Sequence, residues 1–462
     1  MEANEILAKA ESLRNGLSTG FRDEIVKSLY TEAENIAKRA VKTTTNKKYD
    51  FDQKIDRLVT SPYAGLPIML ILLSIIIWLT VSGANVVSAW IAVVLFGIGD
   101  YGRALFEQIG MPWWITGFIW DGVYLGLAWV VSVMLPPMLI FFPAFTFLED
   151  LGYLPRVAFN LDWMFKKTGA HGKQSLTMAM GFGCNAAGVI STRVIDSPRE
   201  RLIAILTNNF VPCNGRFPTL IMLATVFVAA SFPPAITSII AAGTVVAVVL
   251  IGVGFTFLAS WILSRTVLKG EASAFTLELP PYRRPNVSRI LYTSIIDRTI
   301  FVLWRAMQTA APAGAIIWVL ANIPFGDSSL ANAIANWLNP LGVLIGLDGI
   351  ILLSYIIAIP ANEIVVPTMM MLYVGAGMMI NGPTTSNEIY NLLVYQNGWT
   401  MLTAINLMLF ALLHNPCATT IITIYKETKS YKWATLSVVM TLGTAFLVTF
   451  LTASIARMFG WG

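Results

Sequence analysis

The stretch GFGCNAAG, residues Gly181–Gly188, decides the fold, because it places glycines, a cysteine and an asparagine inside a segment that otherwise has the composition of a membrane helix. Glycine is among the weakest helix formers. A helix that breaks inside a membrane frees backbone N–H and C=O groups, and such groups are tolerated only where they are buried in protein or line a cavity. The stretch therefore predicts a turn that builds part of a site.

The composition around this stretch is that of an all-α polytopic membrane protein. Of 462 residues, 56% are hydrophobic and only 12% are charged, and the mean hydropathy is +0.67. Soluble domains carry about 25% charged residues. The net charge of +5 bears on orientation, and we expect no nucleic-acid partner because no basic patch with interleaved aromatic residues occurs. Three cysteines are too few and too dispersed for a disulfide framework.

We expect no enzymatic activity and no nucleotide bound by this chain. Gly172-Lys173 lacks the upstream glycine and the following Ser or Thr of a Walker A loop. No catalytic triad or metal-hydrolase motif is visible. The first apolar run begins only near Gly65, after a segment rich in Lys and Arg, so we expect no signal peptide. This order predicts a multi-pass protein of the plasma (inner) membrane with a cytoplasmic N-terminus.

Charge and hydropathy divide the chain into four parts. Residues 1–57 are predicted to be a cytoplasmic helical segment, with apolar residues at helical spacing from Ile25 to Ala40. This segment is either a solvated helix hairpin or a docking element for a soluble partner, and periodicity does not separate the two. Residues 58–264 form a first transmembrane gate half, 265–292 a cytoplasmic linker, and 293–462 a second gate half.

The distribution of Lys and Arg predicts two segments that enter the membrane and return. Ser175–Thr192 lies between basic loops, which belong in the cytoplasm, so it should turn back at residues 181–185. Leu341–Val374 lies between loops without Lys or Arg and should turn near Ile359–Glu363. One hairpin enters from inside and the other from outside, which is typical of an inverted repeat.

Seven full spans are predicted beside the two hairpins, with the C-terminus outside. The loop after the first span is expected over Gly83–Asp121, where Arg103 is the one basic residue. Two spans carry their own breaks, at Val211–Arg216 and at His414–Cys417, each following one of the hairpins. The spans are 65–82, 122–147, 202–230, 234–264, 297–323, 401–425 and 433–457.

All three cysteines, Cys184, Cys213 and Cys417, lie at these breaks. A single cysteine is often only a small buried hydrophobe. Three at the breaks favour a soft metal site, because thiolates suit Fe(II), Cu(I) or Zn(II) rather than Mg(II) or Ca(II). Asn185 and Asn214 could add weaker oxygen ligands. A weak mixed site suits transport, since the ion must also leave.

Two further ionisable residues complete the predicted metal set. Glu363 sits at the tip of the second hairpin, and carboxylates inside membranes are functional by default; the alternative is a carboxylate near an outer vestibule. His414 adjoins the second break and could be a ligand, although a lone histidine more often makes hydrogen bonds.

Three charged residues near the breaks and span ends have open roles. Arg216 is expected to be structural, either pairing with a carboxylate such as Glu363 or capping freed carbonyl groups. Glu149 and Asp150 end the second span and could receive a cation at its exit or cap helices.

Several ordered motifs resemble the membrane permease portion of the FeoB family of ferrous-iron transporters, over about residues 50–460. The first half is similar to the family at GFGCN and at three further stretches, and the second half at two more. These stretches are LEDLGYLPRVAF (Leu148–Phe159), STRVIDSPRERL (Ser191–Leu202), VPCNGRFP (Val211–Pro218), ANEIVV (Ala361–Val366) and NPCATTIITIYKETKSYKWA (Asn415–Ala434).

The resemblance implies import of Fe2+ as the transported substrate across a bacterial or archaeal inner membrane, with the gate cysteines on the path. Typical members also carry an N-terminal GTP-binding domain and a helical domain. Residues 1–50 resemble at most the end of that helical part. We therefore expect a separate GTP-binding FeoB-type G protein as a partner, with a FeoA-like small protein as a second candidate. A homo-oligomer is left open.

Departures from the family pattern leave the cargo open. Ala186-Ala187 stand where the family often has Val-Pro, and Asn362 replaces a common Lys. Fe(II) is preferred over Mn(II) because the ligands are soft. A nucleoside-type solute transporter and a G-protein-linked membrane sensor remain alternatives.

Overall fold

The computed structural model describes residue 9 and residues 21–40, 47–61, 63–270, 282–325, 328–360, 362–374 and 386–460. Within these ranges the chain is almost entirely helical. A two-residue antiparallel pair, β1 (Pro324–Phe325) with β2 (Ser328–Ser329), is the single sheet of the described part. The predicted all-α class is confirmed.

Six helices of the described chain are long and apolar enough to cross a membrane, which confirms a multi-pass membrane protein. A seventh is added if the bent pair α15 (Leu330–Leu344) and α16 (Gly349–Ile357), which meet at 110°, counts as one span. The six are α4 (Gly65–Gln108), Trp113–Leu151, Ile236–Arg265, Val287–Asn322, Met401–Thr428 and α21 (Tyr431–Met458).

Three of these spans combine shorter helical elements, and two of the three include wide π-helical turns. Trp113–Leu151 joins α5 (Trp113–Thr116), the π-helix η1 (Gly117–Tyr124) and α6 (Leu125–Leu151). Val287–Asn322 joins α13 (Val287–Tyr292), the π-helix η6 (Thr293–Ile300) and α14 (Phe301–Asn322). The predicted linker 265–292 is therefore helical from Val287 on, and its residues 271–281 lie outside the described residues.

The predicted loop Gly83–Asp121 is wrong. Helix α4 continues through Gly83 for 44 residues, and the next helix already begins at Trp113. A single glycine costs a helix only about 1 kcal/mol relative to alanine, and the residues after it are as apolar as those before it. The side chain of Ile140 packs where a Cβ of Gly83 would lie, so the glycine serves close helix packing.

The predicted breaks in two spans are confirmed. Span 202–230 is divided into α10 (Pro198–Thr207) with the 3₁₀ turn η3 (Asn208–Phe210), and α11 (Phe217–Leu223) with the π-helix η4 (Ala224–Val228). The span 401–425 is likewise divided into α19 (Met401–Leu413) and α20 (Ala418–Thr428). The unwound residues are 211–216 and 414–417.

The first hairpin turns at one residue. Cys184 is extended, with φ −157° and ψ 123°, between α8 (Gln174–Gly183) and α9 (Asn185–Ser191). Both arms lie against the side chain of Asn208. A Cβ on Gly181 would come within 2.9 Å of its Oδ1, and one on Gly188 within 2.5 Å of its Nδ2. The two glycines therefore let the arms close around one amide.

The second hairpin repeats this arrangement in the other half. Helix α16 is followed by a turn that contains the 3₁₀ turn η7 (Asn362–Ile364), and α17 (Val365–Val374) leads away. The backbone N–H of Ala418 donates to the carbonyl of Ile359 at 2.9 Å. The tip of the second hairpin is therefore joined to the second broken helix.

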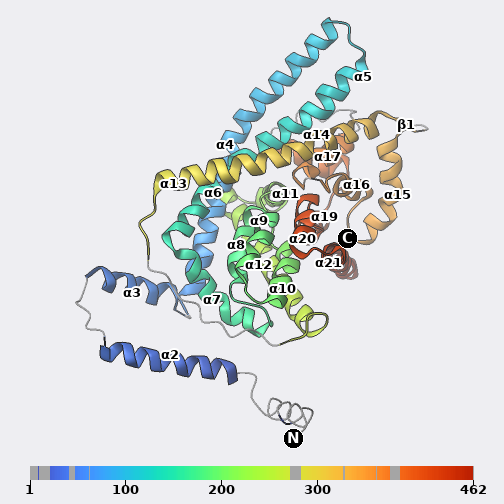
Figure 1. The fold of residues 1–462 in the computed structure, drawn as a ribbon. Coiled ribbons are helices and arrows are strands. Elements are labelled where there is room, and N and C mark those ends of the chain that lie inside the picture. The colour runs from blue at the N-terminus through green and yellow to red at the C-terminus, as the bar shows by residue number, and fades with distance from the viewer. Residues whose placement is uncertain are drawn as a thin grey trace.

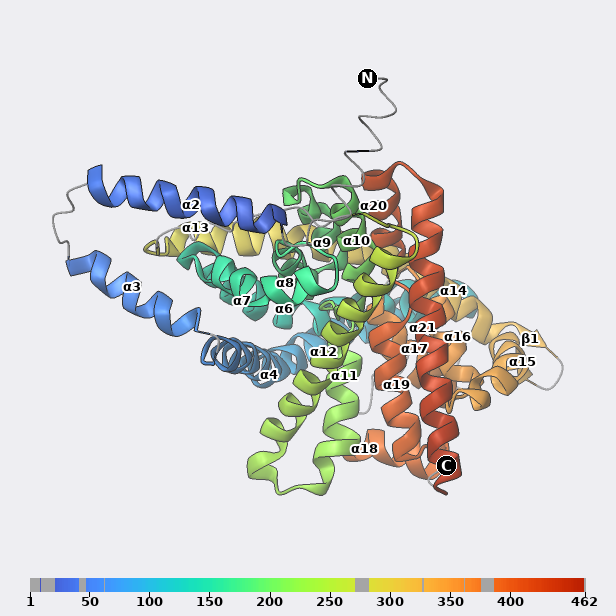
Figure 2. The same cartoon turned by 90° about the horizontal axis from the view of Figure 1, so that it is seen from below.

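The helices run in two groups. Figure 2 shows α11, α12 (Pro234–Arg265), α19 and α21 side by side, with the break regions between them. Figure 1 shows the α13–α14 span running along this group, with α4 and the α5–α6 span extending beyond it. One buried cluster runs through both groups, including Phe142 of α6, Phe210 of η3 and Leu412 of α19.

The N-terminal helices are α2 (Phe21–Ala40) and α3 (Lys47–Val59). The described side chains of α2 are exposed. Helix α3 is held by α7 (Tyr153–Lys167), where the buried Arg156 donates to both carboxylate oxygens of Asp56, at 3.0 and 3.2 Å. The guanidinium also lies 4.1 Å from the ring centre of Tyr282. The N-terminal segment, α7 and the linker thus meet at one arginine.

Candidate ion path at the two helix breaks

Arg216 joins the two breaks. It is 1% exposed and lies at the end of the first break, just before α11. Its Nη1 donates to the carbonyls of Asn209 (2.9 Å) and Leu412 (2.6 Å), and its Nη2 to those of His414 (2.8 Å) and Asn415 (3.4 Å). Of the two predicted roles, the capping of freed carbonyl groups is confirmed.

Asn185 binds the first hairpin to the first break. With its amide nitrogen directed at the two neighbouring carbonyl groups, it donates to Val211 and to Gly181, each at 3.1 Å. The carbonyl of Asn185 in turn accepts from Nδ2 of Asn208 at 3.2 Å. Asn185 was predicted to be a ligand, and its amide nitrogen holds the first hairpin against the first break.

The three thiols converge from three segments. Cys184 sits at the hairpin turn, close enough to Cys417 for the two thiols to interact electrostatically. Cys213, 8% exposed in the first break, lies within range of both other thiols. Cys417 precedes α20, with its sulfur 3.3 Å from the hydroxyl of Thr420. The fold thus brings the predicted thiols into one region.

Glu363 reaches the same region from the second hairpin. Its carboxylate packs directly against Gly215, so that a Cβ on this glycine would overlap with Oε1. The carboxylate is also within electrostatic range of Cys213 and Cys417. Among the described residues, no Lys or Arg forms an ion pair with it.

His414 and Asn214 each keep a buried polar atom that has no hydrogen-bond partner among the described residues. Nδ1 of His414 lies 2.9 Å from the carbonyl of Ala411 and 3.1 Å from that of Phe410, so it carries the proton. Its Nε2 is buried and unpartnered, as is Nδ2 of Asn214. The free imidazole nitrogen is the one that a metal would use. The ring itself packs on Tyr355, with centroids 4.7 Å apart.

These groups do not form a closed metal site in the described chain. No three His, Cys, Asp or Glu side chains there are grouped closely enough to hold an ion together. The predicted donors instead lie along the turns of two hairpins and two breaks. Such a series offers few ligands at a time, and a path for an ion needs sites that it can leave.

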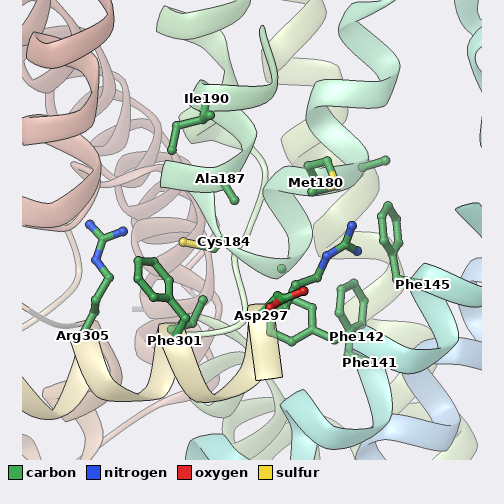
Figure 3. Close-up of a pocket in the computed structure, with 14 residues that line it drawn as sticks. Phe141, Phe142, Phe145, Met180, Cys184, Ala187, Ile190, Asp297, Phe301 and Arg305 are labelled. Atoms are coloured by element: carbon green, nitrogen blue, oxygen red, sulfur yellow. The ribbon is translucent and has the colours of Figure 1, made fainter. Parts of the chain in front are cut away.

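A cavity of about 130 Å³ opens beside Cys184, and we name it the thiol cavity. Figure 3 shows the sulfur of Cys184 pointing toward Phe301 and Arg305 of α14, with Phe141, Phe142 and Phe145 of α6 forming a wall. Asp297 and Arg298 of η6 complete the lining. Sequence reasoning missed this cavity and its charged residues, because its walls come from segments more than 100 residues apart.

Ion pairs fasten the ends of the two halves on one side of the molecule. Glu427 at the end of α20 accepts from Arg193 at 2.6 and 3.0 Å and from Arg201 at 3.0 Å. Nearby, Lys173 contacts Asp196 at 3.0 Å, and its ammonium lowers the pKa of that carboxyl group. The residues after the first hairpin are thus tied to the second broken helix.

Comparisons with known proteins agree with this two-part architecture. The family model described as "Gate: Nucleoside recognition" matches residues 131–227 and 303–431, and each segment contains one hairpin and one broken helix. A second model, described as "Ferrous iron transport protein B C terminus", matches residues 245–297. No solved structure matches the chain.

The chain is similar to transporters from several bacteria. It is 27% identical to the Fe(2+) transporter FeoB of Staphylococcus aureus (strain MSSA476), covering 99% of this chain and 68% of the relative. The FeoB of Campylobacter jejuni is 27% identical, with 90% and 68% covered. An Fe(2+) transport protein A/FeoB fusion protein of Porphyromonas gingivalis is 26% identical, with 97% and 56% covered. The chain belongs to the FeoB family of ferrous-iron transporters and is matched over their membrane permease portion.

Proposed function

We propose that this chain imports Fe2+ across a bacterial or archaeal inner membrane along the two helix breaks. The observation that carries the proposal is the convergence of four elements on one buried region: two hairpin tips and two unwound segments, joined by Arg216. Unwound backbone at the repeat interface is where transporters bind their cargo. The similarity to Fe(2+) transporters supports Fe2+ as the cargo.

The donor set fits a passing ferrous ion. Thiolates from Cys184, Cys213 and Cys417 are soft ligands that Fe(II) accepts, and the carboxylate of Glu363 supplies charge. The free Nε2 of His414 is a further donor. Because thiols bind metal as thiolates, each step of binding releases protons, and flux should rise with pH until the thiols are ionised.

The N-terminal segment is the proposed contact for a partner. With the N-terminus cytoplasmic, α2 presents exposed apolar residues, including Ile25, Leu29 and Ile36, to that compartment. A separate GTP-binding protein that docks there would reach the membrane helices through the Arg156–Asp56 pair. This chain performs no nucleotide chemistry itself in the proposal. The fusion protein of P. gingivalis supports a FeoA-like protein as a second partner.

The test is anaerobic flux into proteoliposomes that contain this chain alone. Uptake of Fe2+ and Mn2+ is followed beside the triple variant Cys184→Ser, Cys213→Ser, Cys417→Ser. Met178→Leu is the matched control, because it removes a buried sulfur of α8 that belongs to a separate core cluster. We expect Fe2+ uptake in the intact chain and the control, and a loss of at least about tenfold in the triple variant, because serine hydroxyl groups replace the three soft donors that suit Fe(II).

Each other outcome has a defined meaning. Equal uptake by all three proteins would remove the thiols from the path. Faster uptake of Mn2+ than of Fe2+ would show that Mn2+ is the preferred cargo. Uptake that appears only after a GTP-binding partner is added would make that partner obligatory.

A nucleoside is the second candidate cargo, because the matched gate model is described by nucleoside recognition. A nucleoside site needs an aromatic surface and fixed polar groups. The aromatic rings beside the second break, those of Tyr355, Phe410 and His414, pack against one another. Uridine uptake that is independent of metal would favour this candidate over iron.

A further inference from the structure

The thiol cavity has a charged neighbour. A second cavity of about 340 Å³, here the charged vestibule, lies at the end of α6. It is lined by Glu149 and Asp150 together with Arg283, Arg289 and Arg298. Arg298 alone among these charged residues also lines the thiol cavity. Its side chain therefore stands between the two spaces.

The position of Arg298 is fixed by two partners on α6. Its Nη2 donates to Glu149 Oε2 at 2.8 Å, and its Nη1 to Thr146 Oγ1 at 3.0 Å. The arginine side chain is 20% exposed and the glutamate 44%. The next carboxylate, Asp150, accepts from the backbone N–H of Asn286 at 2.9 Å, directly before α13. Two consecutive acidic residues thus hold the α13–η6 segment against α6.

The element that carries Arg298 has wide turns. Thr293–Ile300 is a π-helix, a form that is frequent at functional sites. Within it the hydroxyl of Ser294 is buried and has no hydrogen-bond partner in the part of the chain that the structure describes. A segment with wide turns and an unsatisfied hydroxyl group is poorly suited to serve only as a rigid wall.

We propose that Arg298 is the gate between the thiol cavity and the charged vestibule. Paired with Glu149, it closes the passage, because a fixed guanidinium repels a divalent cation and occupies the space. When the pair separates, the arginine withdraws and the carboxylates of Glu149 and Asp150 face the ion. The gate rests on the proposed function for its cargo, whereas its opening can be observed without any cargo.

The test measures how readily Cys184 is modified from the vestibule side. The background is the chain with Cys213→Ala and Cys417→Ala, in vesicles of both orientations. Two membrane-impermeant methanethiosulfonates are used, one cationic and one anionic. A change of charge alone moves their rates in opposite directions, whereas an opened passage raises both.

Arg298→Ala should raise both modification rates at least about tenfold from the side predicted to be cytoplasmic, because it removes two hydrogen bonds of a charged group. Glu149→Gln should raise them less, since the arginine remains. Arg305→Ala is the matched control. This arginine lines the same cavity and interacts electrostatically with Cys184, but it forms no ion pair with Glu149. Arg305→Ala should therefore raise one of the two modification rates and lower the other.

Equal rates for Arg298→Ala and the unmodified background would overturn the gate. So would opposite shifts like those of Arg305→Ala. The proposed function is judged separately, by Fe2+ flux in the cysteine variants. If the chain fails to carry iron but Arg298→Ala still raises both modification rates, the gate is supported and Fe2+ is rejected as the cargo.

Discussion

The two helix breaks satisfy their freed carbonyl groups in different ways. At the first break a neutral amide takes part, since Asn185 donates to the carbonyl of Val211, while Arg216 donates to that of Asn209. At the second break a cation does so, and that cation belongs to the first half: Arg216 donates to Leu412, His414 and Asn415. The first break is completed from within its own half, whereas the second depends on the other.

The hairpin tips differ in the same sense. The first tip brings a thiol, Cys184, and the second a carboxylate, Glu363, which rests on Gly215 of the opposite half. The repeat thus preserves where the backbone unwinds and varies the chemistry placed there. A site between such halves can offer soft and charged donors together.

Removal of Arg216 should have the largest effect. Arg216→Met leaves four buried carbonyl groups without their donor, and each orphaned group costs about 1–3 kcal/mol, so we expect almost no folded protein. Arg216→Lys keeps the charge but lacks the forked N–H donors of arginine. Its stability should therefore lie between that of the parent and that of the Met variant. Size-exclusion profiles and thermal unfolding in detergent measure this. A Met variant as stable as the Lys variant would show that the bridge is dispensable.

A substitution at Gly215, where the two halves touch, should have the next largest effect. Gly215→Ala places a methyl group on the Glu363 carboxylate, so it should lower stability and Fe2+ flux. In a chain that also carries Glu363→Ala the added methyl group has room. We expect a coupling of about 1–3 kcal/mol in the double-mutant cycle of unfolding free energies. Additive effects would mean that the two residues do not touch.

Two asparagines, one in the first hairpin and one in the first break, should distinguish a structural role from a role in transport. Asn185→Leu loses two hydrogen bonds and should cost about 1–3 kcal/mol of stability. Asn214→Leu should cost less, because Nδ2 of Asn214 has no partner to lose. Its flux should fall nonetheless if the amide faces the ion. Thermal unfolding and flux are measured on both variants, and equal stability losses would contradict the assignment.

The smallest effect is expected at the exposed pair of Lys173 and Asp196. Asp196→Asn should leave thermal unfolding at neutral pH nearly unchanged, because exposed pairs contribute little. The pKa of Asp196 is lowered in the folded chain. Any contribution is therefore present above the ordinary carboxyl pKa and is lost as pH falls through the lowered one. A difference from the parent that grows in acid would contradict this sign.

Much of the architecture was predictable from local sequence. The distribution of Lys and Arg predicted the two hairpins. Glycine, proline and cysteine within apolar runs marked the two breaks, because few other signals interrupt a membrane helix. The same logic failed at Gly83, where a lone glycine without neighbouring breakers stayed helical. Turn residues are informative in clusters and ambiguous alone.

The bonding roles were not predictable, because their partners are distant in sequence. Arg216 had two possible roles, and its acceptors lie 196–199 residues away. The pairing of Arg298 with Glu149 spans 149 residues. Asn208, which lies between the arms of the first hairpin, looked like an ordinary polar residue of a span. Spacing identifies the donor types, and only the fold identifies which backbone groups they reach.

The reach of Arg216 also sets a problem of timing for biosynthesis. Its three acceptors in the second half are translated almost 200 residues later, which is roughly 10–40 s at ribosomal speeds of about 5–20 residues per second. During that interval the guanidinium has only the carbonyl of Asn209 from its final set. The first half therefore inserts with an unfinished polar centre, and its last folding step waits for the end of the chain.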